Sequence, residues 1–146
     1  MKYRIYLDIC CFNRPYDDQS YQVIFLESEA KLFVQSKILS DDFELAWSYV
    51  IDLENFFNPY DERKKSIARW RDVATVDIDE SEEIVELANR IMLKGVKKKD
   101  SLHVACAVVA KCQYFLTTDK GILNKKIDGI VLINPIDFVR ELEVYK

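Results

Sequence analysis

Short apolar runs alternate with longer helical patterns along the chain. The short runs are rich in aromatic and β-branched residues, as buried strands are, and they occupy residues 3–7, 43–47, 75–78, 114–117 and 130–133. Helical patterns occupy residues 21–37, 48–57, 61–72, 80–94 and 97–110, and Pro135 opens a final helix. Strands that alternate with helices predict an α/β fold, with a mostly parallel central sheet covered on both faces.

Turn and capping residues mark where several elements begin. Turn-forming residues at 13–15 indicate a loop over residues 9–18, and Ser20 is a candidate cap for the helix that follows. The apolar period of that helix predicts a buried face made of Val23, Ile24, Leu26, Ala30, Phe33 and Val34. Residues 120–126 are expected to form a short helix or a loop.

Residues 97–119 are predicted to form one helix, a tight connection and one strand. Only His103 interrupts the apolar run of this helix, which is therefore expected to be buried on nearly all sides. Asp100 lies in the first turn of the helix, and Asp119 comes directly after the strand. Because the helix runs antiparallel to the strand it feeds, the two carboxylates are expected at the same edge of the sheet.

Length and composition indicate one domain spanning residues 1–146. Apolar residues make up 49% of the chain, with only three Gly and three Pro, so disorder is not expected. No apolar run approaches the roughly 20 residues that span a bilayer, and Asp8 interrupts the N-terminal segment, so we expect neither a membrane span nor a signal peptide. The protein is predicted to be cytoplasmic. Its net charge of −4 argues against a large basic face for duplex DNA but is compatible with a small nucleic-acid site.

The four cysteines are Cys10, Cys11, Cys106 and Cys112, and no CxxC pair occurs. In a cytoplasmic chain they are predicted to be small buried apolar residues rather than disulfide partners. A zinc site built from His103, Cys106 and Cys10 or Cys11 is a less favoured alternative, because the usual ligand spacings of zinc sites are missing.

Two acidic residues follow predicted strands, and two lie within predicted helices. Asp8 and Asp119 come at the carboxyl ends of strands, where the working site of a parallel sheet lies. Taken singly, Asp8, Asp100 and Asp119 are equally well explained as turn or helix caps. Taken together, they are expected to converge if the sheet is parallel.

Glu54 lies in a helix that the sequence predicts to be largely buried. Leu53, Phe56 and Phe57 surround it, so a glutamate at this position is less ordinary than one on a solvated face. Asp52, two positions away, is predicted to point elsewhere and to be solvated.

Convergent carboxylates repel one another, and burial raises their pKa values unless a cation joins them. Oxygen ligands suit Mg²⁺ or Mn²⁺. Such an ion activates water and neutralises charge that develops on a phosphodiester. The acidic residues therefore predict a magnesium or manganese site with phosphodiester chemistry.

Four motifs follow one another in a set order. They are YLD at 6–8, Ser48 followed six residues later by Glu54, DSLHVA at 100–105 and TTD at 117–119, of which the last two are the most specific. In order and spacing these motifs resemble the PIN domain family, the fold of many bacterial toxin ribonucleases, along nearly the whole chain. The resemblance implies a three-layer α/β/α sandwich and an RNA-cleaving site. Carried over residue by residue, the ligands of Mg²⁺ or Mn²⁺ are Asp8, Glu54, Asp100 and Asp119. Many members are held by an antitoxin.

Further residues near the motifs are candidates for substrate binding. Thr118 would fit a role in orienting the aspartate after it or in touching substrate. Arg14 and Lys120 are candidates for holding phosphates, although a solvated surface explains the lysine equally well. Cys10 stands where many PIN domains carry a small polar residue such as Asn. His103 is interpreted as a packed helix histidine.

Other enzyme classes fit the chain poorly. A phosphatase of the haloacid dehalogenase type requires a second aspartate where Cys10 stands, and the three glycines form no GxGxxG motif for NAD. Lys120 is misplaced for a phospho-receiver domain. The remaining rival is a PIN-like module that binds RNA or a protein without cleaving. The helices at 21–37 and 48–57 are candidate surfaces for a homodimer or an antitoxin.

Overall fold

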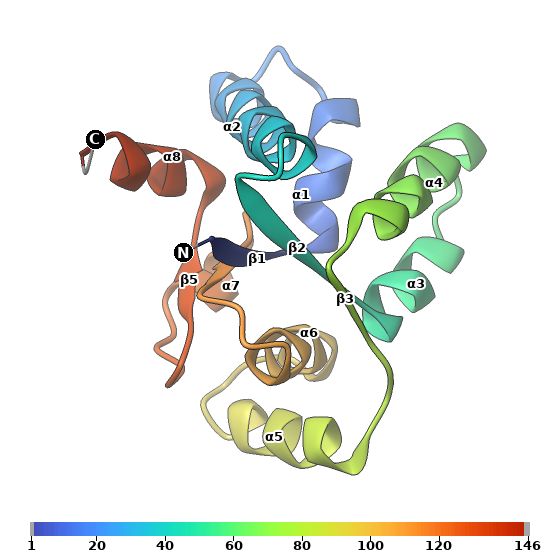
Figure 1. Ribbon diagram of the computed structural model, residues 1–146, viewed down its shortest axis with the longest axis vertical. Coiled ribbons are helices and arrows are strands. Elements are labelled where there is room, and N and C mark those ends of the chain that lie inside the picture. Colours follow the sequence, from blue (N-terminus) through green and yellow to red (C-terminus); the bar gives the residue numbers. More distant parts are fainter. Residues whose placement is uncertain (1, 145–146) are drawn as a thin grey trace.

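A computed structural model describes residues 2–144 and has helices on both faces of one five-stranded sheet (Figure 1). The strands are β1 (Tyr3–Leu7), β2 (Phe43–Ser48), β3 (Val76–Ile78), β4 (Tyr114–Leu116) and β5 (Val131–Ile133). They lie in the order β3-β2-β1-β4-β5, and every neighbouring pair is parallel. The predicted α/β class and its parallel sheet are therefore confirmed.

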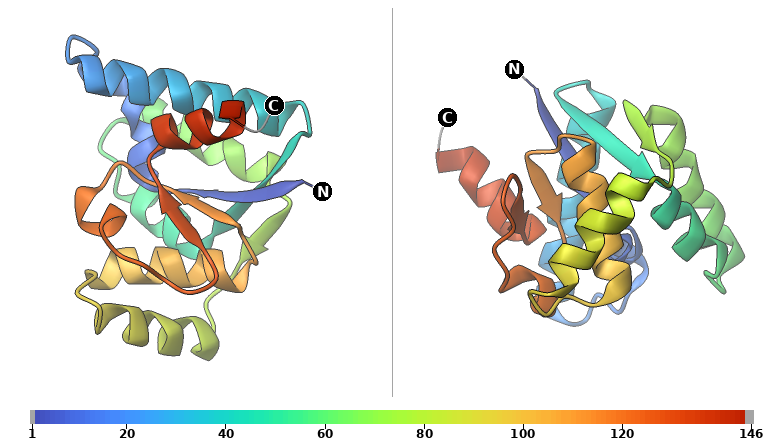
Figure 2. Two further views of the ribbon diagram at one scale, coloured as in Figure 1. Left: turned by 90° about the vertical axis from the view of Figure 1, so that its left-hand side faces the viewer. Right: turned by 90° about the horizontal axis from the view of Figure 1, so that it is seen from below.

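The helices form two layers around this sheet (Figure 2). They are α1 (Ile9–Asn13), α2 (Gln22–Leu39), α3 (Tyr49–Phe56), α4 (Asp61–Ala68), α5 (Glu82–Met92), α6 (Lys98–Val109), α7 (Lys120–Leu123) and α8 (Pro135–Val144). On one face α2 packs against α8 and α1, and on the other α6 contacts the sheet and α5 packs on α6. Among the described residues, no helix has the length and apolar character needed to cross a membrane.

The helix α6 is buried because the sheet lies on one side of it and α5 on the other. Val104, Ala105, Cys106 and Ala107 have no exposed surface, as the apolar run predicts. All four cysteines are free thiols, and Cys10 is the one that is not fully buried, so their reading as packed residues is largely confirmed. Burial raises the pKa of Cys106 to about 12, which keeps this thiol protonated at neutral pH.

The segment after β1 differs from the predicted loop over residues 9–18. Asp8 caps a short helix, α1, by accepting a hydrogen bond from the backbone N–H of Ile9 at 2.8 Å. A 3₁₀ turn (Arg14–Tyr16) follows it. Ser20 is not the cap of α2, which begins after Tyr21 without a side-chain cap. The loop prediction was wrong because Asp8, directly after β1, supplies a cap that lets a helix begin at once.

The face that α2 turns inward is partly polar, contrary to the apolar pattern. Residues Val23, Leu26 and Phe33 are exposed, whereas Glu27, Ser28, Lys31 and Gln35 are buried together with Ala30 and Val34. Glu27 accepts hydrogen bonds from Arg14 at 2.8 Å and from Asn134 at 2.5 Å, which satisfies its carboxylate inside the fold. These tertiary partners, rather than the hydrophobic period of the helix, determine which side of α2 is buried.

The helix α3 is also more exposed than predicted. Leu53, Phe56 and Phe57 are 56%, 65% and 73% exposed, so the expectation of a largely buried helix was wrong. Asp52 was expected to be solvated; its side chain is 40% exposed, and it also accepts a hydrogen bond from the Trp47 indole at 2.8 Å. The side of α3 that packs inward carries Val50, Ile51 and Asn55.

Candidate metal centre

Asp8 lies at the carboxyl end of the central strand, β1. Its backbone N–H donates to the carbonyl of Leu116 at 2.9 Å, which extends the pairing of β1 with β4. Its side chain is buried, with 6% of its surface exposed. One carboxylate oxygen accepts from the backbone of Ile9, and the other accepts from the Thr117 hydroxyl at 2.9 Å. Both oxygens are thus held in place by donors from the two adjoining strand ends.

Thr117 links Asp8 to Asp119. Its buried hydroxyl accepts from the backbone N–H of Asp119 at 3.1 Å while it donates to the Asp8 carboxylate. Asp119 caps α7 by accepting from the Gly121 backbone at 2.8 Å, and its side chain is exposed at the rim of the site. A Cβ at Gly121 would lie 3.1 Å from the Asp119 carboxylate, so the small residue leaves room for this cap.

Glu54 reaches the same edge from α3 through a contact with His103. The Nε2 atom of His103 forms a close hydrogen bond with the Glu54 carboxylate, and its Nδ1 atom lies 2.5 Å from the Tyr6 hydroxyl. That hydroxyl is also 2.7 Å from Ser48 Oγ, and Ser48 in turn caps α3. A series of buried hydrogen bonds therefore connects Ser48, at the start of α3, through Tyr6 of β1 and His103 of α6 to the Glu54 carboxylate.

His103 is a site residue that the sequence interpretation missed. It is fully buried, as a packed histidine would be, but its Nε2 atom lies 3.9 Å from Asp8 as well as against Glu54. One ligand atom from each of Asp8, Glu54 and His103 lies within 4.8 Å of the other two. Both ring nitrogens are engaged by Tyr6 and Glu54, which argues against the zinc alternative with cysteine ligands.

Asp100 completes the cluster from the first turn of α6. Partial burial raises the pKa of this carboxyl, and the negative charges of Asp8, Asp119 and Glu54 raise it further, whereas His103 lowers it. Among the described residues, the group whose ligand atoms lie within 4.8 Å of one another includes Asp8, Glu54 and His103 but neither Asp100 nor Asp119. Four acids from β1, α3, α6 and the end of β4 converge at one edge of the sheet.

The donor set fits a hard divalent cation. Carboxylate oxygens dominate it, and such oxygens are the ligands that Mg²⁺ and Mn²⁺ prefer. Burial first, and then repulsion from the neighbouring carboxylates, raises the pKa of Asp100, and a bound cation would relieve that repulsion. His103 forms a hydrogen bond with the Glu54 carboxylate, as groups that orient a metal-binding carboxylate do.

Cys10 occupies the position next to these acids where a small polar residue was expected by resemblance. Its sulfur lies 3.5 Å from both the Asp8 carboxylate and the Thr117 hydroxyl. It also accepts from the Thr118 backbone N–H at 3.4 Å. The thiol therefore makes the contacts of a polar residue at this place, with longer and weaker hydrogen bonds.

The predicted substrate-binding residues lie in different surroundings. Arg14 is engaged by Glu27 at 2.8 Å and by Asp17 at 2.9 Å, so its charge is already offset within the fold. Lys120 is exposed and opens α7 directly after Asp119. Thr118 is half-buried between the strand end and the helix. Their roles toward a substrate remain predictions.

No family model and no curated protein sequence matches the chain. Among solved structures, the chain is similar to the crystal structure of VapBC2 from Rickettsia felis bound to a DNA fragment from their promoter. The TM-score is 0.55, the sequence identity is 17%, and the match covers 90% of this chain and 98% of the other. At this identity the likeness concerns the fold, and it is consistent with the three-layer α/β/α sandwich that the sequence predicts.

Proposed function

We propose that this protein is a metal-dependent endoribonuclease that hydrolyses phosphodiester bonds of RNA at the carboxylate cluster. The observation that supports it most is that Asp8, Glu54 and His103 bring ligand atoms within 4.8 Å of one another. They do so at the sheet edge where the start of α6 and the end of β4 also place Asp100 and Asp119. The resemblance of the motifs to PIN domains and the fold shared with VapBC2 point in the same direction.

In this proposal the four acids hold Mg²⁺ or Mn²⁺. The bound ion supplies an activated water and offsets charge that develops on the phosphate. Thr117 keeps one oxygen of Asp8 turned toward its hydroxyl and so aligns the carboxylate. His103 holds Glu54 in place through the series of buried hydrogen bonds that begins at Ser48. These two residues would position the acids without touching the RNA.

Cleavage of a labelled single-stranded RNA tests the proposal. Purified protein is expected to cut the RNA in Mn²⁺ and to lose this activity in EDTA. Asp8→Asn and Asp100→Asn are each expected to reduce the rate at least about 100-fold, since each removes a carboxylate from the ion. Asp41→Asn is the matched control, because this aspartate is exposed, pairs with Lys2 at the opposite end of the strands and has a positive φ that asparagine tolerates.

Two results would contradict the ribonuclease proposal. Equal cleavage by the wild type, Asp8→Asn and Asp100→Asn would assign the activity to a contaminant. Tight RNA binding without cleavage in any divalent ion would favour the rival function, a PIN-like binding module. Mn²⁺ binding measured by titration calorimetry separates a module that still holds the ion from one that does not.

The exposed apolar side of α2 supports a protein partner, which we propose to be an antitoxin or a second copy of this chain. Val23, Phe25 and Leu26 are 62%, 48% and 52% exposed in the first turns of this helix, and Tyr21, just before it, is 64% exposed. Large apolar side chains exposed together on one segment are typical of interaction surfaces. Light scattering is expected to give about twice the mass of one chain if the partner is a second copy, and Leu26→Glu would then restore the monomer. A monomer at every concentration would exclude a second copy of the chain as the partner.

A further inference from the structure

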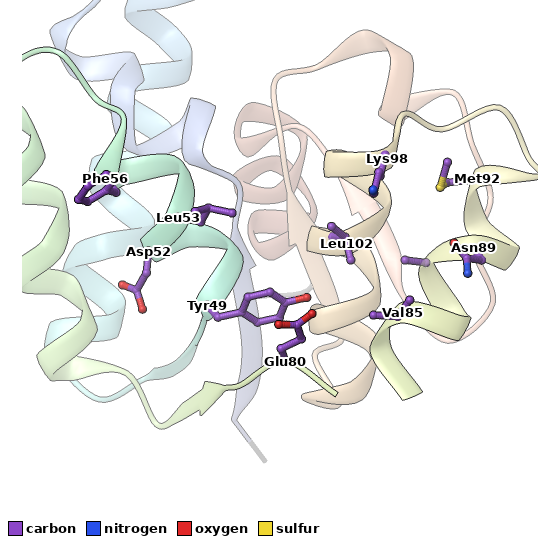
Figure 3. A pocket seen from close by; sticks show the side chains of 11 residues that line it. Tyr49, Asp52, Leu53, Phe56, Glu80, Val85, Asn89, Met92, Lys98 and Leu102 are labelled. Atoms are coloured by element: carbon purple, nitrogen blue, oxygen red, sulfur yellow. The ribbon is translucent and has the colours of Figure 1, made fainter. Parts of the chain in front are cut away.

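A groove between α3 and α6 opens beside the carboxylate cluster. It has a volume of about 300 Å³ and is lined by Tyr49, Val50, Leu53, Glu54, Phe57, Lys99 and Leu102. Glu54 is therefore shared between the cluster and the groove, and the remaining lining is apolar and aromatic except for Lys99. Tyr49, Leu53 and Leu102 also face a second, larger groove between α3, α6 and α5, which Figure 3 shows from close by.

Phe57 is held in place beside Glu54 although its ring is exposed. Its backbone N–H donates to the Glu54 carbonyl at 3.2 Å and so closes the last turn of α3. The ring lies edge-on to Phe56, with 5.1 Å between the centroids. A ring that is 73% exposed and lines the same groove as Glu54 presents a flat apolar face to a ligand at that carboxylate.

One lysine lines the groove although the chain as a whole is acidic. Lys99 Nζ lies 3.8 Å from the Glu54 carboxylate, and 64% of the lysine side chain is exposed. Lys97 and Lys98 come directly before it at the start of α6. A cation beside an aromatic floor is complementary to a ligand that combines flat rings with phosphates.

We propose that this groove binds an unpaired nucleobase of the RNA next to the scissile phosphate, with Phe57 as the stacking platform and Lys99 as a phosphate contact. The proposal rests on the ribonuclease function proposed above, because the cluster that shares Glu54 sets where the scissile phosphate lies. A base can stack on Phe57 only when it is outside a duplex. The groove would therefore direct the enzyme to single-stranded RNA and would discriminate weakly among bases.

Binding measured in an Asp8→Asn background separates recognition from cleavage. Phe57→Ala is expected to raise the Kd for a fluorescently labelled single-stranded RNA by about 5- to 150-fold, the effect typical of losing one stacked base. Phe57→Tyr keeps a ring and is expected to bind like the parent. Tyr21→Ala is the matched control, because it removes a similarly exposed ring just before α2, away from the groove.

A single abasic nucleotide moved along the RNA locates the stacked base. When the abasic nucleotide lies next to the mapped cut site, the RNA is expected to bind the parent and Phe57→Ala with the same affinity. When it lies at a distant position, Phe57→Ala is expected to bind more weakly than the parent. The negative slope of log K against log salt is expected to become shallower by about 0.7 in Lys99→Gln, the value for one phosphate contact on a single strand. A duplex of the same sequence is expected to show no dependence on Phe57.

The outcomes distinguish this inference from the ribonuclease proposal. If the wild type never cleaves but Phe57-dependent binding persists, the ribonuclease proposal fails and the base site remains. If the wild type cleaves in Mn²⁺ but Phe57→Ala binds RNA like Tyr21→Ala, the base site is overturned. It is also overturned if sedimentation shows that Phe57→Ala dissociates a dimer at the concentration where RNA binding is lost, because a second copy would then occupy the groove.

Discussion

His103 and Thr117 orient the acids of the cluster, and neither is acidic itself. His103 contacts Glu54 and lies 3.9 Å from Asp8, while the Thr117 hydroxyl lies between Asp8 and the Asp119 backbone. The sequence interpretation correctly predicted that His103 is buried but assigned it only a packing role. A helical pattern indicates which positions are buried, and it carries no information about the partner of each ring nitrogen.

Asp100 is expected to destabilise the protein when no metal is bound. Its pKa is raised by burial and by neighbouring carboxylates above the ordinary value of 3.8. Between the ordinary and the raised pKa the native state binds more protons than the unfolded state, so stability falls as pH rises through that window, and the full loss is present at pH 7. Asp100→Asn is therefore expected to raise the metal-free Tm at pH 7 by about 1–4 °C, with a smaller gain below pH 4.

Thermal unfolding in EDTA at several pH values measures this effect. Asp41→Asn provides the baseline, because that side chain is 83% exposed and lies away from the cluster. A lower Tm for Asp100→Asn at pH 7 would show that the carboxylate makes a favourable contact and is not held against repulsion.

At the scale of single elements, α2 departs furthest from its sequence pattern. Its inner face carries Lys31, which is 5% exposed and whose ammonium lies 5.5 Å from the centre of the Phe12 ring. Burial lowers the pKa of Lys31 to about 8 from the ordinary 10.5. A lysine in this position costs stability while it is charged.

Lys31→Met is expected to stabilise the protein below pH 8 and to flatten its response to alkaline pH. Between the native pKa of about 8 and the unfolded value of 10.5, the unfolded state binds the extra proton, so wild-type stability rises with pH. The rise is on the order of 3 kcal/mol over this window. Urea unfolding from pH 7 to 10.5 measures it, with Lys37→Met on the same helix as the control. Parallel curves for wild type and Lys31→Met would rule this explanation out.

At the scale of the whole molecule, the parallel sheet explains why the acids meet. The strands β1 and β4 are neighbours and point the same way, so Asp8 and Asp119 emerge at one edge. The helix α6 runs back along β4 and brings Asp100 to that edge, and α3 leaves β2 there with Glu54. This strand order thus brings four carboxylates to one edge, and their mutual repulsion lowers the stability of the folded state.

Divalent ions are expected to stabilise the folded protein through this site. A ligand that binds only the native state adds about 2.7 kcal/mol when its concentration is 100 times its Kd. Mn²⁺ or Mg²⁺ should therefore raise the wild-type Tm by several degrees, and EDTA should reverse the shift. Asp8→Asn should respond much less, whereas Asp41→Asn should respond like the wild type. Equal shifts in all three proteins would place ion binding elsewhere on the surface.

The sequence by itself determined the α/β class, the bounds of β1, the burial of α6 and the edge at which Asp8, Asp100 and Asp119 lie. These features depend on local periodicity and on strand order, which the pattern of side chains expresses directly. Only the tertiary structure decided the inner face of α2, the exposure of Phe57 and the contact between His103 and Glu54. Each of these depends on partners brought from distant segments, and the balance between burying an apolar side chain and satisfying a charged one is set where those segments meet.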